Sequence, residues 1–179
     1  MSLAVTLRPA AKADATCIAV LAMQVWLDTY ATQGIRRLIA DEVLAAFAPQ
    51  AIEALMARPH TAFFVAECDH HLVGMAQVTQ GTAQALVPFQ SQAELDRLYV
   101  QEPFTRQGVG SLLLAHAERW CESYGAQALW LTPWVHNVRA LRFYEHCGYT
   151  DHGATYFEMG SERHENRVLA KALNADLRG

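Results

Sequence analysis

Residues 105–111 read TRQGVGS and stand between a strand-like run at 95–100 and a helix-like run that follows them. A strand, a glycine loop and a helix in this order build a backbone cradle for a pyrophosphate. Glycine lets the chain come close to the ligand, and consecutive N–H groups at a helix N-terminus point at its oxygens. The sequence therefore predicts that this loop binds a phosphorylated ligand, and it leaves the identity of that ligand to other residues.

Length and composition predict one globular domain over residues 1–179. The chain is 52% hydrophobic and 18% charged, which is typical of a folded domain and not of a disordered one. The net charge of −4 gives no reason to expect a nucleic-acid partner. We expect no membrane partner either, because no stretch approaches the roughly 20 apolar residues that cross a bilayer and the N-terminus does not read as a signal peptide.

The four cysteines occur singly, at positions 17, 68, 121 and 147, with no CxxC pair. Single cysteines in apolar segments are typical of free thiols, so we expect a reducing, cytoplasmic location. The histidine pair at 70–71 lies between two apolar runs and fits a hairpin turn. Because no ligand spacing accompanies this pair, no metal is expected.

Hydrophobic periodicity and turn residues predict an α/β (α+β) fold with a mixed central sheet of about seven strands flanked by helices. Strands are expected over residues 3–8, 61–66, 72–78, 93–100, 128–132, 149–159 and 167–173. Helices are expected from the N-cap Asp14 to Gly34 and over 41–47, 49–58, 108–124 and 137–147. The helix at 108–124 is expected to turn inward the side chains of Val109, Leu112, Leu113, Ala117 and Trp120.

Pro133 directly follows the apolar strand at 128–132. Proline cannot donate a hydrogen bond to a neighbouring strand, so pairing must fail or open at this point. If this strand lies beside the strand at 93–100, the two splay apart just beyond the glycine loop. Their unpaired backbone groups could then bind an amide-rich arm of the ligand.

The stretch from about Glu94 to Tyr149 resembles the GNAT superfamily of acetyl-CoA-dependent N-acyltransferases. The resemblance rests on LYV at 98–100, the loop TRQGVG at 105–110 and NVRALRFYEHCGY at 137–149. A glycine loop alone is common, but the loop together with the N-x-R-A-x-x-F-Y-x-x-x-G-Y pattern at this distance is specific. The resemblance implies the GNAT fold for the whole chain and acetyl-CoA as the acyl donor.

The resemblance also implies how the donor is held. The backbone amides of residues 107–111 would bind the CoA pyrophosphate, and the backbones of Leu98 and Val100 would pair with the pantetheine arm, which Asn137 would also contact. The donor-binding residues expected on this basis are Leu98, Tyr99, Val100, Thr105, Arg106, Gln107, Gly108, Val109, Gly110, Ser111, Asn137, Ala140 and Tyr144. The family's loop usually starts with Gln or Arg, where this chain has Thr105, and we expect Arg106 to compensate.

The chemistry of acetyl transfer needs a neutral amine, a donor for the oxyanion and a proton for the leaving thiolate. Tyr144, expected near the thioester sulfur, is the candidate acid, and the alternative is a tyrosine packed only for its ring. The backbone amide of Tyr99 or Val100 is the candidate oxyanion donor. Glu94 is the first candidate base and Asp96 the second. Ordered water in place of a dedicated base and a purely solvated Glu94 both stay open, and a bulge would change which acids share a face.

The acceptor is expected at the end of the first helix, where Trp26, Asp28 and Tyr30 could bind a cationic amine by cation–π and charge interactions. A core stripe that ends in an acidic residue is the alternative. The run FEMGSE at 157–162 and the run at 26–30 show a short, weaker resemblance to bacterial polyamine (spermidine/spermine) acetyltransferases.

The sequence thus predicts an acetyl-CoA-dependent N-acetyltransferase that acts on a primary amine of a small molecule, with a polyamine-like amine favoured, by direct attack in a ternary complex. Two alternatives stay open: acetylation of a protein or peptide amine, and a non-catalytic sensor of acyl-CoA. A homodimer is left open by analogy with other family members.

Overall fold

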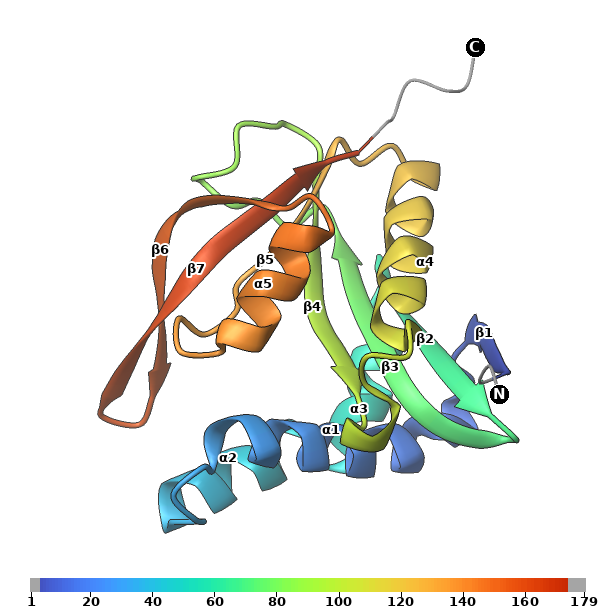
Figure 1. Cartoon of the computed structure of the whole chain (residues 1–179), viewed down its shortest axis with the longest axis vertical. Coiled ribbons are helices and arrows are strands. Elements are labelled where there is room, and N and C mark those ends of the chain that lie inside the picture. The colour runs from blue at the N-terminus through green and yellow to red at the C-terminus, as the bar shows by residue number, and fades with distance from the viewer. Residues whose placement is uncertain (1–3, 174–179) are drawn as a thin grey trace. The chain divides into compact units, whose positions relative to one another are not determined.

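The computed structural model describes residues 4–173. The strands are β1 (Val5–Pro9), β2 (Thr61–Cys68), β3 (His71–Gln80), β4 (Gln92–Val100), β5 (Ala128–Leu131), β6 (Thr150–Met159) and β7 (Glu162–Ala172). The α-helices are α1 (Ala15–Tyr30), α2 (Arg37–Ala46), α3 (Pro49–Met56), α4 (Val109–Ser123) and α5 (Val138–His146) (Figure 1). Two short 3₁₀ turns, Lys12–Asp14 and Glu102–Phe104, precede α1 and the glycine loop.

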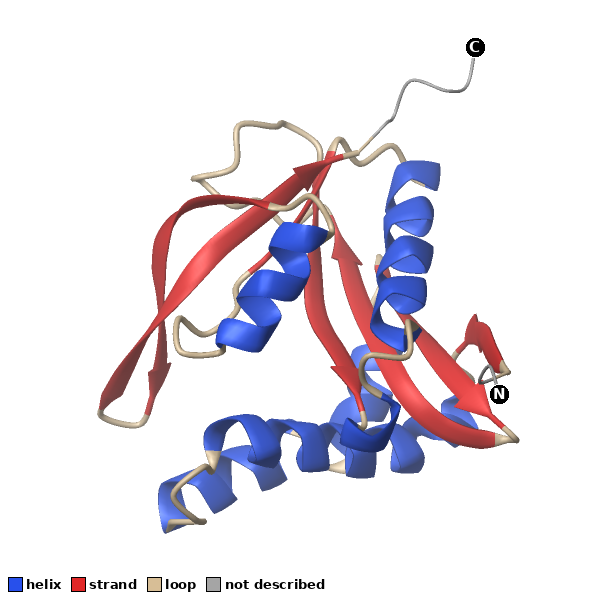
Figure 2. Cartoon of the chain, viewed as in Figure 1, coloured by secondary structure: helices blue, strands red, loops and turns tan. Residues whose placement is uncertain are grey.

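The seven strands form one mixed sheet in the order β1-β2-β3-β4-β5-β7-β6. The β1–β2, β5–β7 and β6–β7 pairs are antiparallel, and the β4–β5 pair is parallel. The predicted fold class, a mixed sheet of about seven strands with flanking helices, is therefore confirmed (Figure 2).

Contacts divide the chain into two compact units. The first unit contains the residues up to Val78 together with Arg97–Ala117, and the second contains Thr79–Asp96 together with the residues from Glu118 on. Because β4 and α4 each contribute to both units, the predicted site residues are distributed over the two.

In the first unit, helices cover both faces of the strands. The core on one face joins α1, α2 and α3 to β2 and β3, through Ala15, Ile18, Ala19, Leu21, Ala22, Val43, Phe47, Ile52, Phe63, Val65 and Met75. Successive strand residues point to opposite faces, so Phe64 faces the other way. Its ring meets His116 of α4, with the ring centroids 4.6 Å apart.

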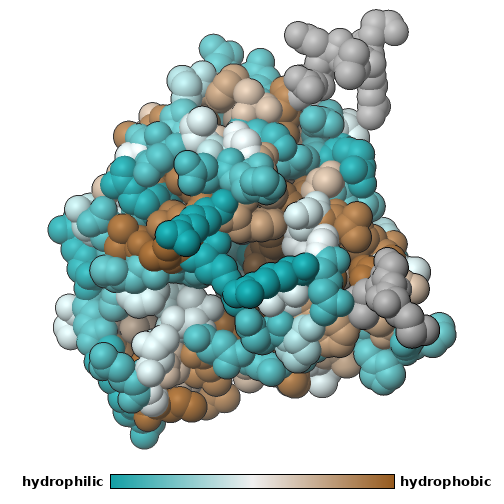
Figure 3. Space-filling view, viewed as in Figure 1, coloured by the Kyte–Doolittle hydropathy of each residue, from teal (hydrophilic) through white to brown (hydrophobic). Residues whose placement is uncertain are grey.

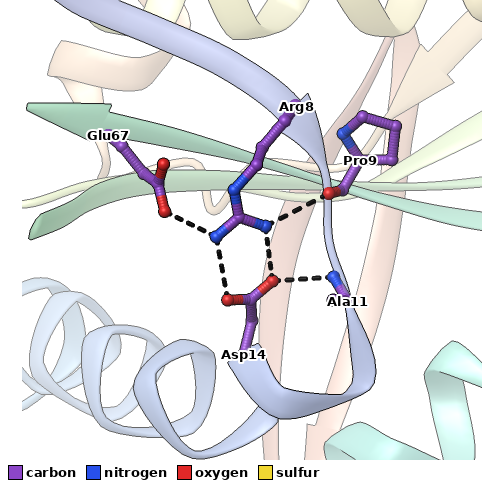
Figure 4. Close-up of polar contacts among 5 residues, drawn as sticks. All are labelled: Arg8, Pro9, Ala11, Asp14 and Glu67. Carbon is purple, nitrogen blue, oxygen red and sulfur yellow. Dashed lines mark hydrogen bonds and ion pairs between the residues drawn. The ribbon is translucent and has the colours of Figure 1, made fainter. Parts of the chain in front are cut away.

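A charged network ties β1 to the start of α1 and to β2 (Figure 4). The Arg8 guanidinium contacts both carboxylate oxygens of Asp14, at 2.7 and 2.9 Å, and also donates to Glu67 at 2.5 Å. The Asp14 carboxylate accepts a further bond from the Ala11 N–H at 2.7 Å. Asp14 does precede α1, but it makes no side-chain cap bond to that helix. Asp14 is thus the N-cap residue, as predicted, but its side-chain oxygens bind Arg8 and the Ala11 N–H and not the helix.

In the second unit, the connection between β3 and β4 covers one face of β5 and β7. Its residues Val87 and Phe89 pack against Ala128, Trp130, Val168 and Ala170. The Trp130 indole N–H donates to the Thr82 carbonyl at 2.9 Å. These contacts fix the irregular segment that the sequence predicts at 81–92.

Several element boundaries differ from those predicted, among them the end of α1, which is Tyr30 and not Gly34. Helix α2 begins at Arg37, four residues early, where the Arg37 guanidinium pairs with Asp41 one turn later at 2.8 Å. Strand β7 begins at Glu162, five residues before the apolar run, because it pairs along the whole length of β6 from Met159 opposite Glu162 (Figure 2). The predicted inward position of Leu112 is also wrong, since its side chain is 48% exposed.

The molecular face drawn in Figure 3 is mixed, with apolar areas between hydrophilic ones. Within residues 4–173, no helix has the length and apolar character that a membrane span requires.

Candidate active site

The glycine loop passes through left-handed backbone just before α4 begins. Arg106 has a φ of 60° and Gly108 a φ of 84°. The first regular helical bond runs from the Leu112 N–H to the Gly108 carbonyl at 3.0 Å, so the N–H groups of the first turn have no acceptor inside the helix. A Cβ built on Gly108 meets no atom within 4 Å. This open turn leading into unpaired helix N–H groups fits an anionic pyrophosphate.

The loop's side chains mostly stabilise the loop itself. The Thr105 hydroxyl donates to the Glu102 carbonyl at 2.9 Å, and the Gln107 amide donates to the Pro103 carbonyl at 2.7 Å. Val109 is buried. Arg106, Gly108 and Ser111 are exposed and Gly110 is half-buried, so the backbone of this segment and the Arg106 side chain are what the loop can offer a ligand.

The C-terminal half of β4, from Leu98 to Val100, lies against Gly74 of β3. A Cβ built on Gly74 would come within 3.0 Å of both the Tyr99 carbonyl oxygen and Leu113 Cδ1, and within 3.4 Å of Val100 Cγ2. Only glycine allows this close approach without a shift of the backbone. Gly74 thus fixes the strand that is predicted to pair with the donor's arm, a role that the sequence analysis missed.

The parallel pairing of β4 with β5 is short. It runs from Gln92 opposite Ala128 to Glu94 opposite Trp130, whereas β4 continues to Val100. The segment after β5 instead follows β7. The Arg167 N–H donates to the Pro133 carbonyl at 3.0 Å, and Trp134 bridges to Asn166. The predicted splay of these two strands at Pro133 is therefore confirmed.

Strand β4 also contains one residue more than β3 over their paired length. The Gly81 N–H donates to the Gln92 carbonyl and the Gln101 N–H donates to the Val73 carbonyl, each at 3.0 Å. Between these bonds β4 advances one residue further, which is the signature of a β-bulge. Alternation along the strand consequently does not decide whether the two candidate acids share a face.

Glu94 and Asp96 differ in their surroundings. Glu94 is half-buried at the last paired position of β4. Asp96 is exposed, and its carboxylate accepts a hydrogen bond from the Thr79 hydroxyl at 2.8 Å. The role of either acid as a base stays a prediction.

Helix α5 carries the candidate acid. Asn137 is the N-cap, and its side chain accepts from the Ala140 N–H at 3.1 Å. Tyr144 is 7% exposed, with ring centroids 5.1 Å from Phe143 and 5.6 Å from Tyr149. The structure thus gives Asn137 and the Tyr144 ring structural roles besides those predicted.

A polar network lies next to α5, at Tyr149, whose ring packs against Tyr144. The Tyr149 hydroxyl donates to Glu118 at 3.0 Å, and the Lys171 ammonium contacts both oxygens of the same carboxylate at 3.0 Å. Burial, reinforced by the Glu118 charge, raises the pKa of Tyr149 well above its usual value.

Four aromatic side chains of the first unit form a group that we call the aromatic cluster: Trp26 and Tyr30 of α1, Phe47 after α2, and Tyr99 of β4. Trp26 lies 4.7 Å from Tyr30 and 6.5 Å from Phe47, and Phe47 lies 6.2 Å from Tyr99, between ring centroids. Burial raises the pKa of Tyr30, and it raises the pKa of Tyr99 to about 12, so both phenols stay neutral at physiological pH.

Only two of the three predicted acceptor residues belong to the aromatic cluster. Trp26 and Tyr30 belong to it, whereas Asp28 is exposed on the helix between them. The sequence analysis missed Phe47, which stands 17 or more residues away from either. It also missed Arg97, although its position two residues before Tyr99 on one strand indicates a shared face.

The run at 157–162 forms the end of the β6–β7 hairpin. Met159 is buried and pairs with Glu162, and Gly160 has a φ of 60° in the turn between them. Turn geometry and burial therefore account for the Met-Gly pair in this run.

The site residues that the sequence predicts thus fall into two groups, each described within its own unit. The first unit holds Leu98, Tyr99, Val100, the loop 105–111, Trp26, Asp28 and Tyr30. The second unit holds Glu94, Asp96, Asn137, Ala140 and Tyr144.

The known proteins that this chain resembles are acetyltransferases. The sequence matches the acetyltransferase (GNAT) family over residues 22–149. An uncharacterised N-acetyltransferase of Lactobacillus delbrueckii subsp. lactis, from the pepI 3′ region, is 29% identical over 118 residues, which cover 66% of this chain and 68% of the relative. Aminoglycoside N(6′)-acetyltransferase type 1 of Stenotrophomonas maltophilia is 29% identical over 164 residues, 88% of this chain and 94% of the relative.

Among solved structures, the PaiA N-acetyltransferase of Thermoplasma acidophilum in complex with coenzyme A has the same fold. It superposes with a TM-score of 0.76 at 21% identity and covers 95% of this chain and 99% of that chain. The family match extends over more than half of the sequence and includes the glycine loop and α5. The chain therefore belongs to the acetyltransferase (GNAT) family and is an acetyl-CoA-dependent N-acyltransferase.

Proposed function

We propose that this enzyme transfers the acetyl group of acetyl-CoA to a primary amine of a small molecule, by direct attack of the amine in a ternary complex. The observation that carries the donor half of the proposal is the loop at Arg106–Gly108, whose left-handed backbone leads into the unpaired N–H groups of α4. The partly buried rings of Trp26 and Tyr30 in the aromatic cluster support the acceptor half, because such rings favour a compact organic substrate.

The residues toward the donor have the following proposed roles. Bound acetyl-CoA supplies an acyl group that is activated as a thioester. The N–H groups of residues 107–111 hold its pyrophosphate, and the backbones of Leu98 and Val100 hold its pantetheine arm. The backbone N–H of Tyr99 or Val100 donates to the oxyanion that forms when the amine attacks.

Proton transfer is assigned to three side chains of the second unit. Tyr144 gives its phenolic proton to the departing thiolate. Glu94, or Asp96 in second place, accepts the proton that the amine loses, directly or through water. Glu94 is preferred because it is half-buried, whereas Asp96 is exposed.

The relative from Stenotrophomonas supports a small acceptor, since its name identifies an aminoglycoside as its substrate and the two chains align over nearly their full lengths. The preference for polyamines rests on the runs at 26–30 and 157–162. Ring packing explains the residues of the first run and turn geometry those of the second without any polyamine. Polyamines therefore enter the acceptor panel as one class among several. Protein or peptide amines and a sensor without catalysis are the alternatives.

The test has two steps on the purified full-length chain. Calorimetric titration with acetyl-CoA should show binding in the micromolar-to-millimolar range, and its absence would refute the donor assignment. Release of the CoA thiol is then followed with diamines, aminoglycosides, amino acids, their amides and short peptides. Thiol release with a small amine supports the proposal. Release only with peptides favours the first alternative, and binding without release favours the sensor.

The cytoplasm is the proposed compartment, and the proposed partners are acetyl-CoA and the amine, with no nucleic acid and no membrane. A homodimer remains a prediction that light scattering at micromolar concentration would test.

A further inference from the structure

Arg97 lies beside the aromatic cluster, and the contacts that it makes within residues 4–173 are to neutral groups. Its guanidinium carbon is 5.3 Å from the centroid of the Phe47 ring. The same guanidinium donates a hydrogen bond to the side-chain oxygen of Gln77. Gln77 is only 2% exposed, which makes it a fixed acceptor on the inner side of Arg97. The cation is therefore held between the Gln77 side chain and the Phe47 ring.

Three other arginines are paired with carboxylates. Arg8 contacts Asp14 and Glu67, Arg37 contacts Asp41, and Arg167 contacts Asp151 and Glu165. Within residues 4–173, no ion pair joins Arg97 to a carboxylate, although its side chain is half-buried. A cation that is partly removed from water and lacks a counter-ion is costly unless a ligand supplies the negative charge.

The donors of Arg97 suit such a ligand. A guanidinium has five N–H donors arranged as a planar fork, and the bond to Gln77 uses only part of them. A carboxylate can accept two parallel bonds from this fork. The half-buried rings of Trp26 and Tyr30 would then cover the apolar part of the same molecule.

We propose that the acceptor is a primary amine that also carries a carboxylate, as an amino acid or an ω-amino acid does, and that Arg97 binds this carboxylate. This inference rests on the proposed function, because it assigns the acceptor class of the same enzyme. It runs against a polyamine, whose second ammonium would face the uncompensated charge of Arg97. Arg97 is thus a specificity-determining residue and takes no part in the proton transfers.

The experiment compares acceptors that differ only in the second group. Thiol release from acetyl-CoA is measured with 4-aminobutyrate, 4-aminobutyramide and 1,4-diaminobutane, and with glycine and glycinamide. In the unmodified enzyme the carboxylates should have a kcat/KM roughly 10- to 100-fold above that of their amides, as expected for a hydrogen-bonded charge pair. Equal values for acid and amide, or a preference for the diamine, would overturn the inference.

Two variants test whether the preference for a carboxylate acceptor depends on Arg97. Arg97→Gln should remove the preference for the carboxylate while the KM for acetyl-CoA stays within about twofold, because the donor loop is separate from this contact. Gln77→Glu keeps Arg97 and places a carboxylate on it, so it should remove the same preference even if Arg97→Gln folds poorly. Arg58→Gln, at an exposed position, is the matched control and should keep the preference.

The outcomes separate this inference from the function on which it rests. Loss of activity with all acceptors in equal proportion would show that Arg97 only supports the fold, and it would overturn the inference alone. Thiol release with no small amine at all, despite acetyl-CoA binding, would overturn the proposed acceptor and the inference together.

Discussion

The hydroxyl of Tyr149 donates a hydrogen bond of 3.0 Å to the carboxylate of Glu118. Tyr149 follows α5, Glu118 lies on α4, and the Tyr149 ring packs against Tyr144. The contact therefore links the cofactor-loop helix to the packing of the candidate acid within the second unit. Because burial and the Glu118 charge raise the pKa of Tyr149, this link has a predictable pH dependence.

We predict that alkaline pH destabilises the protein partly through Tyr149. The pKa of Tyr149 is higher in the folded chain than the ordinary value near 10, so its stabilising effect is complete below that value and is lost as the pH rises above it. Urea unfolding between pH 8 and 11 should show a slope that Tyr149→Phe reduces, by at most about 1.4 kcal/mol per pH unit. Tyr124→Phe, at an exposed position, is the control. Identical slopes for Tyr149→Phe and the unmodified protein would contradict the prediction.

Tyr144→Phe is predicted to lower turnover and to leave donor binding intact. Phenylalanine keeps the ring contacts with Phe143 and Tyr149 and removes only the hydroxyl. Loss of a general acid typically lowers the rate by about 100-fold or more. Single-turnover kinetics measure the chemical step, and calorimetry measures acetyl-CoA affinity. An unchanged single-turnover rate would show that Tyr144 serves only for packing.

Asn137 has two assignments that a set of substitutions can separate. Its side chain caps α5 through the Ala140 N–H, and the family resemblance gives it a contact with the pantetheine arm. Asn137→Ala should cost about 1 kcal/mol of stability, while Asn137→Ser should retain most of the cap. If the amide also binds the donor, both variants should weaken acetyl-CoA binding in calorimetry. Weakening in Asn137→Ala alone would mean that the cap is its whole role.

Local signals in the sequence predicted the features that depend on a few consecutive residues. The turn between β2 and β3 lies where the sequence placed it, with positive φ at Asp69 and His70. Gly125 and Gly148, with φ values of 81° and 89°, end α4 and α5 as expected. Pro133 likewise indicated that β4–β5 pairing would open, and this pairing ends at Trp130, three residues before the proline. In the first two cases one residue's backbone chemistry decides the structure.

Features that depend on residues far apart in the chain were not predictable in the same way. The contact between Phe47 and Tyr99 joins positions about 50 residues apart, and Gln77 meets Arg97 only because their strands are neighbours. At Asp14, the N-cap position was predictable, but the carboxylate binds Arg8 and makes no side-chain bond to the helix. Such choices depend on which partner is near in space, and the sequence pattern does not encode that directly.

The glycine at position 74 gives a packing prediction. Gly74→Ala would put a methyl group 3.0 Å from the Tyr99 carbonyl oxygen, a backbone atom that cannot turn aside. We expect a loss of roughly 1–3 kcal/mol in unfolding free energy and weaker acetyl-CoA binding, because the displaced strand is the one assigned to the pantetheine arm. Gly81→Ala is the comparison, since its Cβ meets no atom within 4 Å and only its φ of 77° is strained. Normal donor affinity in Gly74→Ala, with wild-type stability, would show that β4 tolerates the shift.

The network at Asp14 predicts how the protein responds to acid. Hydrogen bonds from Arg8 lower the pKa of Asp14 in the folded chain, so the stabilisation is present at neutral pH and is lost as the pH falls below about 4 toward the folded value. Since the Arg8 side chain is 37% exposed, solvent screening limits the effect, and Asp14→Asn should cost about 1 kcal/mol at pH 7 and less at pH 3. Asp41→Asn, which breaks the exposed pair with Arg37, should cost at most about 0.5 kcal/mol at either pH. Chemical unfolding of the three proteins at both pH values makes the comparison. An equal cost for Asp14→Asn at pH 3 and pH 7 would mean that its carboxylate charge contributes nothing to the fold.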